Sequence, residues 1–274
     1  MDPRFRGDDS SGTRGNDIIL TMSPDAPSPV SSADPADCPR CQKPAALCVC
    51  DEIVPIDNGV ELLILQHPQE QDRLLGSARL AARHFKNATF KVGLSWPSLS
   101  KILGRETDPK RWAILYLGSL KAEALAAGRD IVVTTGKGDA LLDQDQALRD
   151  IEGVILLDGT WSQAKAIWWR NAWMLKCRRV LLARSRPSRY GKLRKEPHKD
   201  GLSTIEAAAM LMAKLENNPK IEAALNVSFA HMLDKYRAVH GTNPPGAKPP
   251  GVKPFRRRKD GRKPTGRPER PSRN

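Results

Sequence analysis

The sequence GVILLDGTW, residues 153–161, indicates the fold most directly, because an apolar run ends in an acid, a glycine and a helix start. The run at 153–157 has the length and composition of a strand buried on both faces, as in parallel sheets. Ligands of such sheets bind beyond the carboxyl ends of the strands. We therefore expect Asp158 to project its carboxylate into a ligand cleft, with Gly159 permitting a sharp turn or the close approach of a ligand.

A helical pattern follows this turn at residues 162–173. Thr160 and Gln163 have the spacing of a capping box, so the helix is expected to begin there. Trp161, Trp168 and Trp169 do not all share one helical face, so some indole surface should be exposed or line a cavity. A strand, a cap and a tryptophan-rich core helix without any ligand would explain the same pattern equally well.

Apolar runs alternate with helical patterns along the rest of the chain. Strands are expected at 60–65, 89–94, 112–117, 130–134, 154–158 and 179–183, and helices at 74–85, 162–173, 204–216 and 219–239. This alternation predicts an α/β fold with a mostly parallel sheet flanked by helices.

The two ends of the chain differ in composition from its middle. Residues 1–37 are rich in Pro, Ser, Asp and Gly, and residues 241–274 carry eleven Lys or Arg against two acids. Both are expected to be disordered. Of the net charge of +14, about +9 belongs to residues 38–240, so nucleic acid is the expected partner even without the tail.

No apolar run approaches the ~20 residues that a bilayer crossing needs, and no signal-peptide pattern is seen. The sequence therefore predicts a cytoplasmic protein with no membrane partner, and nothing in it points to an obligate protein partner.

Four cysteines lie within thirteen residues: Cys38, Cys41, Cys48 and Cys50. Two close pairs separated by a short loop predict a structural zinc site, a knuckle at residues 38–55 that precedes the main domain at 56–240. A pair of disulfides or four unlinked thiols are the alternatives.

Residues 170–199 contain eleven Lys or Arg and one acid, Glu196. A solvated surface explains many such runs, but here the run follows the tryptophan helix in a chain with a basic tail. We expect contacts with an RNA backbone, and the candidate residues are Arg186, Arg189, Tyr190, Arg194 and Lys195.

Several sequence blocks, in this order, are similar to those of one known family: Gln66-His-Pro-Gln-Glu70, Tyr116-Leu-Gly118, Asp158-Gly-Thr-Trp161, Arg186-Pro-Ser-Arg-Tyr190, Arg194-Lys-Glu-Pro197 and Leu202-Ser-Thr-Ile-Glu206. Together with the paired cysteines, they resemble the DTW-domain proteins, the tRNA-uridine aminocarboxypropyltransferases. The resemblance covers about residues 38–240. Leu117 departs from the pattern, since relatives often carry proline there.

The resemblance implies a SPOUT-like domain whose C-terminal segment forms a knot around S-adenosylmethionine. It implies transfer of the 3-amino-3-carboxypropyl group to N3 of a tRNA uridine in the variable loop, with release of 5′-methylthioadenosine. Uridine N3 carries a weakly acidic proton, so a hydrogen-bond acceptor or base is needed beside it. Asp158 is the first candidate and Glu206 the second, although Ser203 and Glu206 form a capping-box pattern by themselves.

The same blocks supply the residues expected to bind the donor: His67, Gly118, Gly159, Thr160, Trp161, Ser203 and Thr204. A structural histidine and a core indole are the plain alternatives for His67 and Trp161. Three other functions compete: a methyltransferase on the same fold, a non-catalytic zinc-containing RNA-binding factor, and a nucleotide site at Gly136-Lys-Gly138, whose motif is incomplete.

Overall fold

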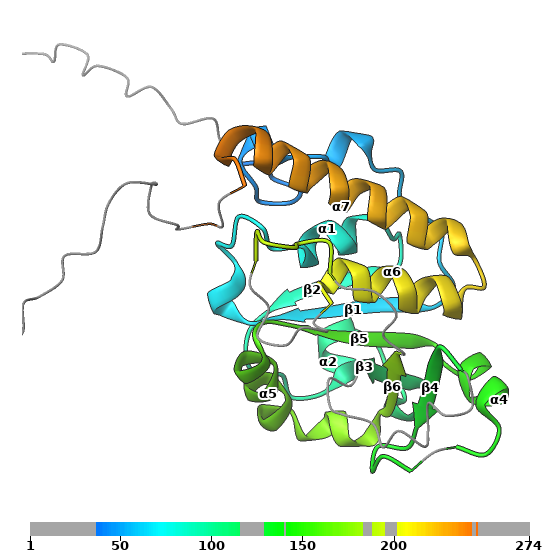
Figure 1. Cartoon of the computed structure of the whole chain (residues 1–274). Helices are drawn as coiled ribbons and strands as arrows, with labels where there is room; N and C mark the ends of the chain where they lie inside the picture. The colour runs from blue at the N-terminus through cyan, green and yellow to red at the C-terminus, as the bar shows by residue number, and fades with distance from the viewer. Residues whose placement is uncertain are drawn as a thin grey trace, which may run out of the picture. The chain divides into compact units, whose positions relative to one another are not determined.

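The computed structural model describes residues 37–115, 129–139, 141–182, 188–194, 202–242 and 245. Within them lies a six-stranded sheet in the order β2-β1-β5-β3-β6-β4 (Figure 1). The strands are β1 Glu61–Gln66, β2 Ala88–Val92, β3 Trp112–Leu115, β4 Ile131–Thr134, β5 Gly153–Asp158 and β6 Arg178–Leu182. All neighbouring strands are parallel except β4 and β6, so the predicted mostly parallel α/β sheet is confirmed.

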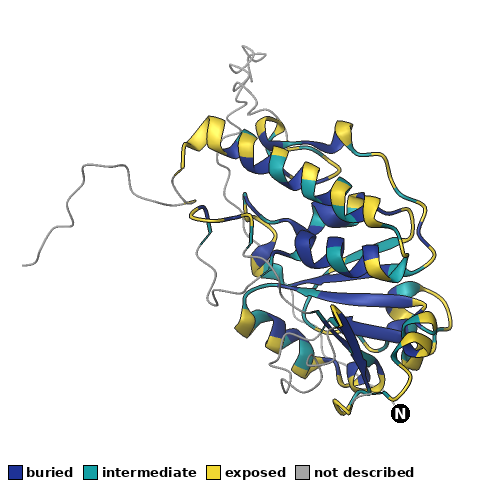
Figure 2. Ribbon diagram, turned by 45° about the vertical axis from the view of Figure 1, so that its right-hand side comes forward, coloured by how far each residue is buried: buried dark blue, intermediate teal, exposed yellow. Residues whose placement is uncertain are grey.

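Helices cover both faces of the sheet, and each face has its own apolar core (Figures 1 and 2). On one face pack α1 Ala78–Arg83, α6 Thr204–Leu215 and α7 Pro219–His240. On the other pack α2 Leu99–Leu103 and α5 Trp161–Arg170. The short α4 Gln144–Arg149 contacts β4 and adds Ala147 to the core of the first face. Residues of β1 and β5 are buried from both sides, which explains why their sequences are continuously apolar.

The central strands β1 and β5 are aligned so that their last residues, Gln66 and Asp158, are partners across the ladder. At the other end Gly153 pairs with Trp112 of β3. A Cβ atom on Gly153 would lie 2.5 Å from the indole of Trp112, so glycine is needed for this fully buried ring to lie against β5. The register therefore brings two polar side chains to one point at the carboxyl ends of two buried strands.

Two helices are shorter than their sequence patterns predict. The helix expected at 74–85 begins only at Ala78, because residues 71–75 form turns and the amide of Gly76 donates to the carbonyl of Arg73. The helix expected at 162–173 ends at Arg170. Asn171 has non-helical angles, its side-chain amide donates to the carbonyl of Ile167, and a 3-10 helix, Ala172–Lys176, follows.

The last two helices, predicted at 204–216 and 219–239, are confirmed as α6 and α7. The predicted C-terminal knot is not shown, since residues 183–187 and 195–201, between β6 and α6, lie outside the described part of the chain. The tails expected to be disordered also lie almost wholly outside it. None of the described helices has both the length and the apolarity needed to cross a membrane.

Candidate functional site

The carboxylate of Asp158 joins three elements at the carboxyl ends of the central strands. Gln66, at the end of β1, donates from Nε2 to Oδ2 of Asp158 at 2.8 Å. The hydroxyl of Thr204, in the first turn of α6, donates to Oδ1. The backbone amide of His67 donates to the carbonyl oxygen of Asp158 at 2.9 Å. We call Gln66, His67, Asp158 and Thr204 the strand-end cluster.

Asp158 is only 8% exposed, so its side chain is largely buried, and the ligand cleft that the sequence predicts beside it stays a prediction. The reason for the burial is that two side-chain donors reach the carboxylate from neighbouring elements. A carboxylate has about four acceptor positions, and these two bonds leave further capacity on both oxygens. The side chain of Gln66, which donates to Oδ2, has a second polar atom, the buried Oε1. This oxygen has no hydrogen-bond partner among the described residues.

The turn after Asp158 is closely packed. A Cβ on Gly159 would lie 2.9 Å from Cβ of Gln163 and 3.4 Å from Cβ of His67. The close approach predicted for this glycine is therefore made at least in part by the protein's own side chains. The predicted capping box at Thr160 is confirmed: the amide of Thr160 donates to Oε1 of Gln163 at 2.6 Å, and the amide of Gln163 donates to the Thr160 hydroxyl at 3.4 Å.

His67 has extended backbone angles, as expected for a residue before proline, and its side chain is half-buried. Its Nδ1 accepts from the amide of Gln69 at 3.2 Å, so in the neutral ring the proton lies on Nε2. The 3-10 helix Pro68–Glu70 that follows is tied to α5 by a 3.3 Å hydrogen bond from Gln163 to Gln69. His67 thus has one ring nitrogen occupied locally and the other able to donate.

Glu206 has a different environment from Asp158. The predicted capping box is confirmed, and Oε2 accepts from the amide and hydroxyl of Ser203, at 3.0 and 2.6 Å. The same oxygen accepts from the hydroxyl of Ser188 at 2.7 Å, and Oε1 accepts from the amide of Arg189 at 2.8 Å. Four donors on one buried carboxylate leave little room for a substrate proton. Glu206 is therefore placed as an anchor for the segment at 188–190.

Tyr190 was expected to touch RNA, and the structure does not allow it, since the side chain is 1% exposed. Its ring packs edge-on against Phe229 at 5.0 Å, and its hydroxyl donates to the carbonyl of Leu75 at 2.6 Å. The aromatic ring in the basic run is thus a core residue. Sequence alone could not separate the two roles, because both favour an aromatic ring with a polar tip.

The other RNA candidates are placed only in part. Arg189 is exposed. Arg194 is half-buried, with its guanidinium 5.4 Å from the ring centre of Tyr190 and 3.7 Å from the carboxylate of the buried Glu70. Arg186, Lys195 and Gly118 lie outside the described residues.

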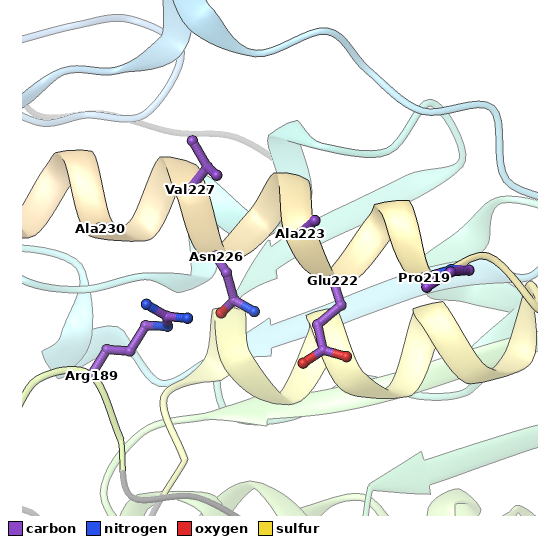
Figure 3. A pocket seen from close by; sticks show the side chains of 7 residues that line it. All are labelled: Arg189, Pro219, Glu222, Ala223, Asn226, Val227 and Ala230. Carbon is purple, nitrogen blue, oxygen red and sulfur yellow. The ribbon is translucent and has the colours of Figure 1, made fainter.

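Arg189 also borders an open pocket of about 420 Å³ on the outer side of α7 (Figure 3). The pocket is lined by Arg189, Pro219, Glu222, Ala223, Asn226, Val227 and Ala230. None of the residues of the strand-end cluster lines it. We therefore keep it separate from the candidate active site.

The tryptophans of α5 are distributed as the sequence predicts. Trp161 is 40% exposed and Trp169 is 76% exposed. Trp168 is half-buried, with the guanidinium of Arg179 5.4 Å from its ring centre. Trp173, beyond the helix, is buried and donates from Nε1 to the carbonyl of Trp96 at 3.0 Å. The indoles therefore face both the core and the solvent.

The sulfur atoms of Cys38, Cys41, Cys48 and Cys50 all lie within 4.8 Å of one another, and none of the chain's five cysteines forms a disulfide. Four thiolates around a tetrahedral zinc ion, each at ~2.3 Å, would be roughly 3.8 Å apart. The 3.9 Å between the sulfurs of Cys41 and Cys48 fits this spacing. The cysteines are therefore positioned to hold a zinc ion.

The acid–base properties of these thiols also fit a cation. Hydrogen bonding from the backbone of Cys41 is the largest of the effects that lower the pKa of Cys38, to about 6. Burial raises the pKa of Cys41 to about 11, and burial raises that of Cys50 as well. One thiolate therefore forms readily, and a bound divalent ion would supply the charge that holds the buried ones.

The cysteine loop is held to the rest of the domain by side chains from the loop itself and from α7. Lys43 is buried and donates from Nζ to the carbonyl of Leu74 at 2.7 Å, and burial lowers its pKa to about 8. From α7, Lys235 donates to the carbonyl of Cys48 at 2.5 Å and Nδ1 of His231 lies 2.6 Å from Oε2 of Glu52. The knuckle thus packs on α7 rather than standing apart.

Sequence reasoning gave no individual role to Gln66 or Lys43, and it gave Gln163 only its place in the capping box, not its contact with Gln69. Gln66 carried a usable signal, since a polar residue closes an apolar strand just before His67. The contacts of Lys43 and Gln163 join parts of the chain that are distant in sequence, and no local pattern marks them.

These features define an α/β protein with a polar cluster at the carboxyl ends of two parallel strands and, near its N-terminus, four cysteines positioned to hold a metal ion. The chain belongs to the DTW-domain family: the model of that family, described as the DTW domain, matches residues 35–237.

Three relatives share a name, tRNA-uridine aminocarboxypropyltransferase 2. The chain is 32% identical to the protein of Mus musculus and 29% identical to that of Macaca fascicularis, over 69% of this chain and 59% of each relative. It is 31% identical to the protein of Drosophila melanogaster, over 77% of this chain and 80% of the relative. No solved structure gives a significant match.

Proposed function

We propose that this protein transfers the 3-amino-3-carboxypropyl group from S-adenosylmethionine to N3 of a uridine in the variable loop of tRNA. The family, the names of the three relatives and the net positive charge support this proposal. The observation that carries it is the strand-end cluster, which brings the acid of the DTW turn together with Gln66, His67 and Thr204.

In the proposed reaction the bond between N3 and the methionine Cγ forms while the bond between Cγ and sulfur breaks. The electron pair of the broken bond stays on sulfur, which neutralises the sulfonium and releases 5′-methylthioadenosine. The proton of N3 passes to an acceptor in the site. Selection of Cγ over the methyl carbon is a matter of orientation, which a rigid site supplies.

Asp158 is the acceptor we propose. Its two hydrogen bonds fix the plane of the carboxylate while leaving lone pairs on each oxygen. Gln66 and Thr204 then act as positioning residues. Glu206 is the weaker candidate, because its oxygens already accept four hydrogen bonds within the protein.

We propose that the carboxylate of the donor binds at the start of α5. Amides at the start of a helix attract anions, and α5 has no acidic side chain in its first turn, whereas α6 has Glu206. We propose that Gly159, Thr160 and Trp161 bind the donor there and that His67 contributes a hydrogen bond from Nε2. Ser203, Thr204 and Gly118 complete the proposed donor site, and we propose the SPOUT-type knot as its far wall.

We propose that the tRNA backbone is bound by Arg186, Arg189, Arg194 and Lys195, of which Arg189 is the exposed member among the described residues. The zinc ion would be structural, since four protein ligands leave no open position for chemistry. We place the protein in the cytoplasm, because reduced thiols are maintained there and tRNA is present.

The test is nucleoside mass spectrometry of unmodified tRNA incubated with the full chain and S-adenosylmethionine labelled in its methionine carbons. We expect a uridine heavier by one aminocarboxypropyl group and an equal amount of 5′-methylthioadenosine. S-adenosylhomocysteine with a methylated nucleoside would indicate a methyltransferase instead. If the donor does not bind at all in calorimetry, while tRNA does, the protein is a non-catalytic RNA-binding factor.

A further inference from the structure

The outer face of α5 carries two exposed indoles with a lysine between them. Trp161, Lys165 and Trp169 are spaced by four residues, which places them on one side of the helix, and all three are exposed. Trp169 is 76% exposed and Trp161 is 40% exposed. Aromatic side chains of this size are normally buried, and exposed ones gather at binding sites. We call these three residues the tryptophan face.

The segment of chain that carries this face is basic. Residues 161–182 contain five Lys or Arg and no Asp or Glu. Lys165, Arg170 and Lys176 are exposed, so indoles and cations are interleaved at the surface. A positively charged surface with aromatic rings is the combination that binds unpaired nucleic acid, because the cations contact phosphates and the rings stack on bases. The exposed cations of this segment are complementary in charge to a polyanion.

The tryptophan face also begins at the candidate active site. Trp161 is the first residue of α5, three residues after Asp158. Eight residues of helix carry the chain about 12 Å from Trp161 to Trp169. An RNA strand leaving the strand-end cluster along α5 would therefore meet the second indole within a few nucleotides.

From this geometry we propose that Lys165 and Trp169 of the tryptophan face bind unpaired nucleotides that flank the target uridine, while Trp161 binds the donor as proposed above. Trp169 stacks on a base and Lys165 contacts the adjoining phosphate. The identification of this RNA as tRNA rests on the proposed function, whereas the binding of single-stranded RNA does not. The class of ligand is thus a short unpaired RNA segment.

The experiment measures binding of the full-length protein to an oligouridylate octamer, to an eight-base-pair RNA duplex and to unmodified tRNA. The variants are Trp169→Ala, Trp169→Leu and Trp169→Phe, with Val239→Ala as the control for loss of an exposed apolar side chain. Lys165→Ala is matched by Lys220→Ala, which removes an exposed lysine from α7.

We expect Trp169→Ala and Trp169→Leu to weaken octamer binding by about 5- to 100-fold, the range found for removal of a stacking ring. Trp169→Phe should retain most of the affinity, because it keeps an aromatic surface. Duplex binding should change by less than about twofold, and both control variants should behave as the unaltered protein. Lys165→Ala should weaken octamer binding more than Lys220→Ala does.

Octamer affinity unchanged in Trp169→Ala would overturn the inference. So would equal losses for the octamer and the duplex, or a self-association of the unaltered protein that Trp169→Ala abolishes and RNA does not compete with. These readouts are independent of catalysis. If the unaltered protein transfers no group, but Trp169→Ala still weakens its binding to the octamer, the proposed function is refuted and the inference about the tryptophan face is supported.

Discussion

Asp158 accepts one hydrogen bond on each carboxylate oxygen, so the consequences of replacing it depend on the residue introduced. Asparagine can still accept from Gln66 and can donate to the hydroxyl of Thr204, which reverses its role. Alanine leaves the buried amide of Gln66 without its acceptor.

We therefore predict that Asp158→Asn lowers the turnover number by about 10²- to 10⁴-fold, the usual effect of losing a proton acceptor, while the affinity for tRNA stays within about twofold. Asp158→Ala should show the same loss and in addition lower the free energy of unfolding by about 1–3 kcal/mol. Turnover assays and urea denaturation measure the two effects. Near-normal turnover of Asp158→Asn would show that Asp158 is not the acceptor.

Glu206 should behave as an anchor. Its replacement by glutamine puts an amide group either at the Oε1 position, facing the amide of Arg189, or at the Oε2 position, facing the donors of Ser188 and Ser203. We predict a loss of about 1–3 kcal/mol in the free energy of unfolding and weaker tRNA binding, with a smaller change in turnover on bound tRNA. Glu222→Gln on α7 is the matched control. A 100-fold fall in turnover at unchanged stability would instead give Glu206 a catalytic role.

The local contacts of these residues could be predicted from the sequence, and their distant ones could not. Both capping boxes follow from a spacing of three residues, and both are confirmed. The bonds from Ser188 and Arg189 to Glu206 span 18 and 17 residues and depend on how the chain returns to α6. The burial of Tyr190 is of the same kind, because Leu75 and Phe229 are far from it in sequence.

At the scale of elements, strand positions were predictable because apolar runs of four to six residues are distinctive, and the final helix pair was predictable from its long amphipathic pattern. Helix ends were less so. The side-chain amide of Asn171, where α5 ends, donates to the carbonyls of Ile167 and Leu94. Leu94 is 77 residues away in the sequence, so no local pattern predicts this contact. The short helices α2 and α4 escaped prediction because five or six residues hold too little periodicity.

The cysteine loop and α7 should lose stability together. Removal of zinc, or Cys41→Ser, should release the loop and with it the contacts of Lys235 and His231 to Cys48 and Glu52. We predict a fall in melting temperature of several degrees, since about 1 kcal/mol corresponds to 2–4 °C in a domain of this size.

Cys177→Ala serves as the control for the cysteine loop, because Cys177 is buried in the opposite core and should leave the zinc content at one per chain. Zinc analysis and thermal unfolding measure both. A Cys41→Ser protein that still binds one zinc with unchanged melting would contradict the assignment.

At the scale of the whole molecule, stability should fall on acidification through His84. Burial lowers the pKa of this histidine to about 4, below its usual value of about 6.5. Above pH 6.5 the ring is neutral in both states. As the pH falls from 6.5 to 4 the unfolded chain takes up the proton first, so up to about 3 kcal/mol of stability is lost.

We predict that His84→Gln flattens this part of the stability profile between pH 7 and 4, as measured by denaturant unfolding at each pH. His240→Gln, which changes an exposed histidine, should leave the profile as it is. If the free energy of unfolding of His84→Gln falls with pH as steeply as that of the unaltered protein, groups other than His84 cause the loss of stability in acid.

The charge of the chain predicts that tRNA binding depends steeply on salt. Each phosphate contact contributes about 0.7–0.9 to the slope of log affinity against log salt concentration. Because about +9 of the charge lies in residues 38–240, a chain ending at residue 240 should keep a slope of several units, with turnover on bound tRNA nearly unchanged. A slope near zero after truncation would place the RNA-binding charge in the tail instead.

The strand-end cluster gathers residues 66, 67, 158 and 204, separated by up to 138 positions along the chain. Contacts between residues so far apart form slowly, and here they need both the pairing of β1 with β5 and the docking of α6. A fragment that lacks β1, β5 or the first turn of α6 therefore cannot assemble the cluster. We therefore expect the proposed donor binding to appear only after α6 has docked, and a chain that ends before residue 204 to lack it.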